Sequence, residues 1–139
     1  MRLHHVQVAC PPGGEGRARR FYADGLGLAE VSKPPELAGR GGAWFRAYDG
    51  GGAVTAEIHV GVEEPFAPAR KAHPALVLES VAELEATAAR LEAAGFAVDW
   101  RERRSFTGFE RFHTVDGAGN RVEVMTPAPA PVPGDAERP

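Results

Sequence analysis

Residues 116–125, Asp-Gly-Ala-Gly-Asn-Arg-Val-Glu-Val-Met, decide the fold of this chain. Gly and Asn tolerate the positive φ angles of tight turns, so residues 116–120 predict a turn. Residues 121–125 predict a strand, because Val122 and Val124 share one face while Glu123 lies on the other. The stretch therefore puts one carboxylate on the polar side of an otherwise apolar strand. Whether this carboxylate has a function depends on which side chains the other strands place opposite it.

The residues before this turn predict the rest of a compact unit. Ser80 is an N-cap, and Glu83 three residues later completes a capping box. The helix that follows, residues 81–94, has an apolar stripe of Leu84, Ala88 and Leu91. The predicted strands of this half are residues 73–78, 96–101 and 111–115, together with the closing strand.

The first 60 residues repeat the same order of elements. The predicted strands are residues 3–9, 29–32, 44–48 and 53–60, and the predicted helix is residues 15–24. His5 and His73 lead the first strand of their halves, and Ile58-His59-Val60 has the pattern of Val122-Glu123-Val124. We interpret this as an internal duplication of about 65 residues per copy.

This duplication defines the expected domain organisation. We predict a first module over residues 1–60 and a second over residues 73–126. An aperiodic linker, residues 61–72, joins them. The Pro-rich residues 127–139 predict a disordered tail.

Composition excludes several classes of function. The chain has 139 residues, a net charge of −3 and no block of like charge, which gives no support for binding nucleic acid or a membrane surface. No apolar run approaches the roughly 20 residues of a membrane span, and the first residues lack the apolar core of a signal peptide. A single cysteine, Cys10, fits a reducing cytoplasm.

Four polar side chains stand out because they occupy the polar faces of their strands at equivalent points of the two halves. They are His5, His59, His73 and Glu123. Two such modules can place their first and last strands around one cleft. Neutral imidazole and carboxylate are ligands that Zn, Ni, Mn and Fe accept. We therefore expect a divalent metal ion with open positions for water or substrate.

At these residues the chain resembles the vicinal oxygen chelate superfamily, which contains glyoxalase I, bleomycin-resistance proteins, fosfomycin-resistance transferases and extradiol dioxygenases. The resemblance spans residues 3–126. It rests on His5-Val6-Gln7-Val8, Arg20-Phe21-Tyr22 with Leu26-Gly27-Leu28, Ile58-His59-Val60, His73-Pro74-Ala75-Leu76 and the segment 116–123. The family's closing turn usually has Pro where this chain has Gly117.

The resemblance implies an α+β fold of paired βαβββ modules that form a cup around a metal, and usually a homodimer. In many dimeric members each site is built from both chains. Carried over by position, the ligands are His5, His73 and Glu123. The fourth position is Glu57 or His59, which share a face, and we favour His59. Glu123 and His59 are the expected catalytic residues.

The expected substrate is a small molecule with neighbouring oxygens, and the expected reaction is of the isomerase or lyase type with the metal as Lewis acid. Gln7, Trp44 and Arg111 are the candidate substrate contacts. Arg111 and His113 share a strand face. His113 can either reach the cup or have a role at the protein surface. Alternatives are a metal-free antibiotic-binding protein, an Fe-dependent dioxygenase and a fosfomycin-type thiol transferase.

Overall fold

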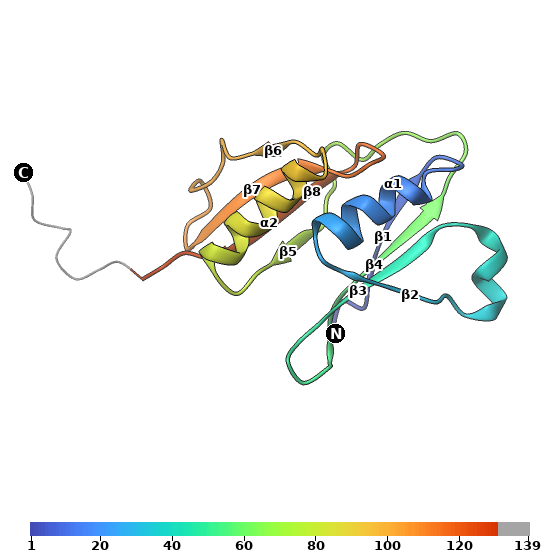
Figure 1. Ribbon diagram of the computed structural model, residues 1–139, viewed down its shortest axis with the longest axis horizontal. Coiled ribbons are helices and arrows are strands. Elements are labelled where there is room, and N and C mark those ends of the chain that lie inside the picture. Colours follow the sequence, from blue (N-terminus) through green and yellow to red (C-terminus); the bar gives the residue numbers. More distant parts are fainter. Residues whose placement is uncertain (131–139) are drawn as a thin grey trace, which may run out of the picture.

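The computed structural model describes residues 1–130 as two four-stranded sheets that lie side by side (Figure 1). The first has the order β1-β4-β3-β2, with strands Val6–Cys10, Val54–Val62, Ala43–Tyr48 and Ala29–Val31. The second has the order β5-β8-β7-β6, with strands Ala75–Val77, Arg121–Pro127, Phe109–Val115 and Val98–Asp99. In this part of the chain no helix has the length and apolarity needed to cross a bilayer.

The two sheets have the same construction, which confirms the predicted α+β fold of paired βαβββ modules. In each sheet the first strand runs parallel to the last, and the other neighbours are antiparallel. Gln7 pairs with His59 in the first sheet, and Ala75 pairs with Glu123 in the second. His59 and Glu123 are therefore equivalent in register. His5 and His73 each precede the paired residue by two positions.

The helices of the two modules pack against each other. Helix α1, Glu15–Arg19, continues as the π-helical turn η1, Arg20–Gly25, and α2 spans Val81–Ala93. Both lie in front of the sheets in the view of Figure 1, and η1 packs against α2. A Cβ atom on Gly25 would lie 2.5 Å from Leu91 Cδ2, so glycine permits this close approach. The fully buried Phe21, Leu84 and Phe112 belong to one continuous core.

Several element boundaries differ from the sequence-based expectations. His5 and His73 lie just before their strands, and β5 begins only after Pro74, which has no N–H to donate to a ladder. Strand β4 continues to Val62, two residues into the predicted linker. A short 3₁₀-helix, η2, Pro35–Arg40, lies between the predicted strands 29–32 and 44–48. The predicted tail lies outside the described residues from residue 131 onward.

The turn at residues 116–120 is a hydrogen-bonded junction between the two halves. Asp116 Oδ1 accepts the backbone N–H groups of Ala118 and Asn120, at 2.9 and 3.0 Å. Asp116 Oδ2 accepts the Tyr22 hydroxyl at 2.8 Å. The Asn120 side chain donates to the Ala9 carbonyl at 2.7 Å and accepts the Ala69 N–H at 2.9 Å. One turn therefore contacts β1, η1 and the linker.

Close packing within this junction requires glycine at position 117. A Cβ atom there would lie 2.5 Å from Arg17 Cβ and 2.9 Å from the Arg17 carbonyl oxygen. A larger residue at this point would push helix α1 away from the turn. This close contact accounts for glycine where the resembled family usually has proline.

The hydrogen bonds of this junction should contribute to the stability of the fold. Asn120→Ala removes three side-chain hydrogen bonds, because the amide also donates to Asp116 Oδ2 at 2.9 Å. At about 1 kcal/mol net for each bond, the free energy of unfolding should fall by roughly 3 kcal/mol. Urea denaturation measures this change. Tyr22→Phe, which removes one bond to the same turn, should cost about 1 kcal/mol. Equal effects of the two variants would contradict the assigned role of Asn120.

Candidate functional site

Three polar side chains of the second module converge on one point. Glu123 lies on β8, His113 pairs with it across the hairpin on β7, and His73 precedes β5. One ligand atom of each lies within 4.8 Å of the others, and among residues 1–130 this is the one such His, Cys, Asp or Glu group. Glu123 and His113 are buried, whereas His73 is exposed.

The two oxygens of Glu123 have different partners. Oε1 accepts a hydrogen bond from Arg111 Nη1 at 2.9 Å. Oε2 lies 3.0 Å from His73 Nε2 and 3.9 Å from His113 Nε2. Arg111 therefore orients the carboxylate so that the other oxygen faces both imidazoles.

The tautomer of His73 follows from its second contact. Its Nδ1 lies 2.7 Å from the Lys71 carbonyl oxygen, which can only accept, so Nδ1 carries the proton. The lone pair of the neutral ring is then on Nε2, the atom that faces Glu123. Two acceptors at 3.0 Å require a proton or a cation between them. A metal ion can replace that proton.

Electrostatics keeps the cluster in the protonation states that a metal needs. Burial alone would raise the pKa of Glu123, but the hydrogen bond from Arg111 and the contact with His73 outweigh it and hold the pKa below its usual value. Burial, followed by the charge of Arg121, lowers the pKa of His113. The carboxylate is thus ionised and the buried imidazole neutral at neutral pH.

This donor set fits a divalent first-row ion. Two imidazole nitrogens and one carboxylate oxygen converge, and the remaining coordination positions are free for water or substrate. Arg111 on the non-converging oxygen corresponds to the supporting contacts that commonly orient metal ligands. His73, His113 and Glu123 are therefore the residues that could hold a metal.

The first module has a separate polar cluster. The His59 ring is stacked between His5, with centroids 4.0 Å apart, and Trp44, at 3.8 Å. His59 Nε2 lies 2.7 Å from Glu57 Oε1, and Arg46 contacts the same carboxylate. Burial lowers the pKa of His59. The hydrogen bonds from His59 and Arg46 lower the pKa of Glu57 even though burial opposes them. Both possible fourth ligands are thus buried and paired with each other.

The predicted site residues fall into these two clusters. His73 and Glu123 are in contact, while His5 and His59 are stacked on each other and are not part of the group around Glu123. The halves do meet at one cavity of about 350 Å³, which both His5 and His73 line. Whether His5 and His59 bind the same metal stays a prediction.

The predicted substrate contacts also divide between the modules. Gln7 and Trp44 line one cavity of about 200 Å³ beside β4. Arg111 is engaged by protein acceptors, because besides Glu123 it donates to Ser105 Oγ at 2.7 Å and to the Glu102 carbonyl at 3.2 Å. A direct role of these three in substrate binding stays a prediction.

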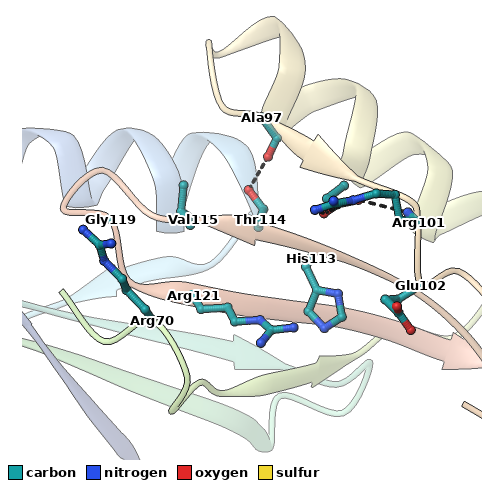
Figure 2. A pocket seen from close by; sticks show the side chains of 10 residues that line it. Arg70, Ala97, Arg101, Glu102, His113, Thr114, Val115, Gly119 and Arg121 are labelled. Carbon is teal, nitrogen blue, oxygen red and sulfur yellow. Dashed lines mark hydrogen bonds and ion pairs between the residues drawn. The ribbon is translucent and has the colours of Figure 1, made fainter. Parts of the chain in front are cut away.

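The sequence analysis does not decide whether His113 belongs to the site, and it does not identify Arg121 as a site residue. A signal for His113 was present, because the closure of the turn by Asp116 and Asn120 fixes the hairpin register. Counting outward from that closure places His113 opposite Glu123. Arg121 shares the Glu123 face of β8. It lines a cavity of about 560 Å³ together with His113, Thr114 and Arg70 (Figure 2).

Comparison with known proteins agrees with this architecture. Residues 2–124 match the model of the Glyoxalase/Bleomycin resistance protein/Dioxygenase superfamily. A glyoxalase family protein from Bacillus anthracis is 38% identical, with a TM-score of 0.75 and coverage of 92% of this chain and 100% of the other. A search of curated proteins gives no match.

Two more distant structures share the fold alone. Lactoylglutathione lyase from Agrobacterium tumefaciens is 20% identical, with a TM-score of 0.64 and coverage of 90% of this chain and 92% of that one. TnmS3, an antibiotic-binding protein from Streptomyces sp. CB03234, is 22% identical, with a TM-score of 0.61 and coverage of 92% and 99%. The family match over residues 2–124 shows that this chain belongs to the Glyoxalase/Bleomycin resistance protein/Dioxygenase superfamily.

Proposed function

We propose that this protein is a divalent-metal-dependent enzyme that acts on a small substrate with neighbouring oxygen atoms, in a reaction of the isomerase or lyase type. The observation that carries the proposal is the convergence of Glu123 Oε2 with the Nε2 atoms of His73 and His113. When bound there, a metal supplies Lewis-acid polarisation of substrate oxygens.

The residues around this point have distinct roles in the proposal. Arg111 holds Glu123 by one oxygen, so the carboxylate keeps a fixed orientation. The Lys71 carbonyl fixes the tautomer of His73. Glu123, ionised at neutral pH, is the candidate to accept a proton from the substrate, and His59 remains a second candidate because its lowered pKa keeps it neutral.

Metal binding makes the first test of this proposal. We expect about one divalent ion per wild-type chain after loading and desalting, measured by mass spectrometry. Loss of one ligand should remove most of the bound ion in His73→Ala, His113→Ala and Glu123→Gln. At a free metal concentration of 100 times Kd, the wild-type free energy of unfolding should rise by about 2.7 kcal/mol.

Glu110→Gln is the matched control for Glu123→Gln. Glu110 is also buried and paired with an arginine, Arg103 at 2.6 Å, but neighbouring residues of β7 face opposite sides of the sheet. This variant should keep its metal. Full metal content in both His113→Ala and Glu123→Gln would contradict the proposed ligands. The identity of the metal would direct assays, since Fe favours oxygen chemistry and Zn, Ni or Mn favours isomerase, lyase or transferase chemistry.

We further propose a homodimer in which His5 of one chain completes the site of the other. The His5 ring is exposed, whereas His59 is buried between two rings and held by Glu57, so His5 is the better placed of the two to reach a second chain. The apolar side chains of Leu3 and Val77 are also exposed near the first strands of the modules.

Mixing two inactive variants tests this shared site. His5→Ala and Glu123→Gln chains should each lose metal as homodimers. After unfolding and refolding together, mixed dimers contain one intact site, so roughly a quarter of the wild-type metal content should return. If His5→Ala alone keeps its metal, or if the mixture recovers none, His5 is not a ligand supplied across a dimer.

A metal-free binding protein is the second candidate function. The observation that favours it is that Glu123 is already paired with Arg111 and His73, and within residues 1–130 no buried side-chain polar atom lacks a partner. With a proton between His73 Nε2 and Glu123 Oε2, the site is therefore satisfied without a metal ion. Absence of metal from the protein even after loading would favour this candidate, and antibiotics would be screened as ligands.

A further inference from the structure

One cavity beside the candidate metal ligands lies on the second module and has several charged side chains in its wall. Its volume is about 560 Å³, within the range of pockets that hold small ligands. His113 is part of its wall, so the cavity begins at the cluster formed with His73 and Glu123. Figure 2 shows the His113 ring and the Arg121 side chain over the same sheet.

Five charged side chains line this cavity, and three of them are already compensated. Arg101 donates to both carboxylate oxygens of Asp99, at distances from 2.5 to 3.0 Å. Glu102 lies 3.6 Å from Arg111 Nη2. The two remaining charges are therefore both positive.

Arg70 and Arg121 are these two cations. Neither guanidinium makes a hydrogen bond or an ion pair with any other residue in the range 1–130, unlike the guanidinium groups of Arg101, Arg103 and Arg111, which each hold a carboxylate. Arg121 is half-buried on β8, two residues before Glu123, so both side chains point to the same face of the sheet.

The two arginines approach the cavity from different elements. Arg121 extends along the sheet toward His113, and Arg70 comes from the linker and lies near Gly119 (Figure 2). The charge of Arg121 is felt at the ring, because after burial it is the largest cause of the lowered pKa of His113. The cavity thus has a metal-binding end and an uncompensated cationic end.

We propose that the substrate carries an oxyanion, a carboxylate or a phosphate-type group, which Arg121 and Arg70 bind while the neighbouring oxygens of the substrate face His113. This inference rests on the proposed function and adds a substrate class to it. A guanidinium donates two parallel hydrogen bonds to such planar or tetrahedral oxyanions, which fixes the orientation of the bound molecule as well as its charge.

Calorimetric titration with inorganic phosphate tests the cationic end without the metal. The full chain is treated with chelator, and phosphate is titrated into the wild type, Arg121→Gln, Arg121→Lys and Arg70→Gln. We expect Arg121→Gln to weaken phosphate binding tenfold or more. Arg121→Lys should fall between it and the wild type, because lysine keeps the charge but not the paired donors. Arg70→Gln should weaken phosphate binding less than Arg121→Gln does, because Arg70 is exposed.

Arg104→Gln is the matched control, because Arg104 is exposed, does not line the cavity and should leave phosphate binding unchanged. Thermal unfolding should show that Arg121→Gln folds as the wild type does, since the Arg121 guanidinium makes no hydrogen bond or ion pair within residues 1–130. Wild-type phosphate binding that is absent, or equal in Arg121→Gln and Arg104→Gln, would overturn the inference.

Metal titration of the same variants separates the two proposals. Arg121→Gln should bind metal like the wild type, because Arg121 is not a ligand. If the wild type binds metal but phosphate affinity is the same in the wild type and in Arg121→Gln, the oxyanion inference fails and the metal proposal stands. If no chain binds metal while phosphate binding depends on Arg121, the metal proposal fails and the cationic pocket stands.

Discussion

The buried carboxylate of Asp116 is the interaction on which the rest of the structure depends. With one oxygen it closes its own turn, and with the other it accepts the Tyr22 hydroxyl and the Asn120 amide. Burial and the nearby Asp116 charge raise the pKa of Tyr22 well above its usual value, so the hydroxyl remains a donor. Through Asn120 the same turn contacts Ala9 in the other module. This polar junction thus links the two sheets.

The same turn sets the geometry of the candidate site. Because Asp116 pairs with Asn120, the hairpin register brings His113 opposite Glu123 and keeps Arg111 and Arg121 on that face. A shift of one residue between the two strands would put Glu123 and Arg121 of β8 on the face opposite to that of His113 and Arg111 of β7. The site is therefore a consequence of turn chemistry, and the parallel pairing of β5 with β8 brings His73 to it.

Much of this could be predicted from the sequence, because strand alternation and turn residues are local signals. They indicate both modules, the face of Glu123 and the equivalence of His59 and Glu123, which the registers confirm. Strand parity alone does not assign His113 to the site, because it does not identify the residue across the hairpin. The stacking of His5 on His59 depends on the parallel pairing of β1 with β4, two strands that are far apart in the sequence. No local pattern encodes that arrangement, nor the set of ion pairs that leaves Arg121 without a carboxylate partner among residues 1–130.

The central claim is that His73, His113 and Glu123 form a metal site. X-ray absorption spectroscopy of the metal-loaded protein tests it most directly, because it reports the atoms around the ion. We expect nitrogen and oxygen ligands at about 2.0–2.2 Å with the scattering of at least two imidazole rings. In His113→Ala, the ion that the variant still binds at excess metal should show the scattering of one ring fewer. A shell of oxygen atoms without imidazole scattering, unchanged in the variant, would contradict the account.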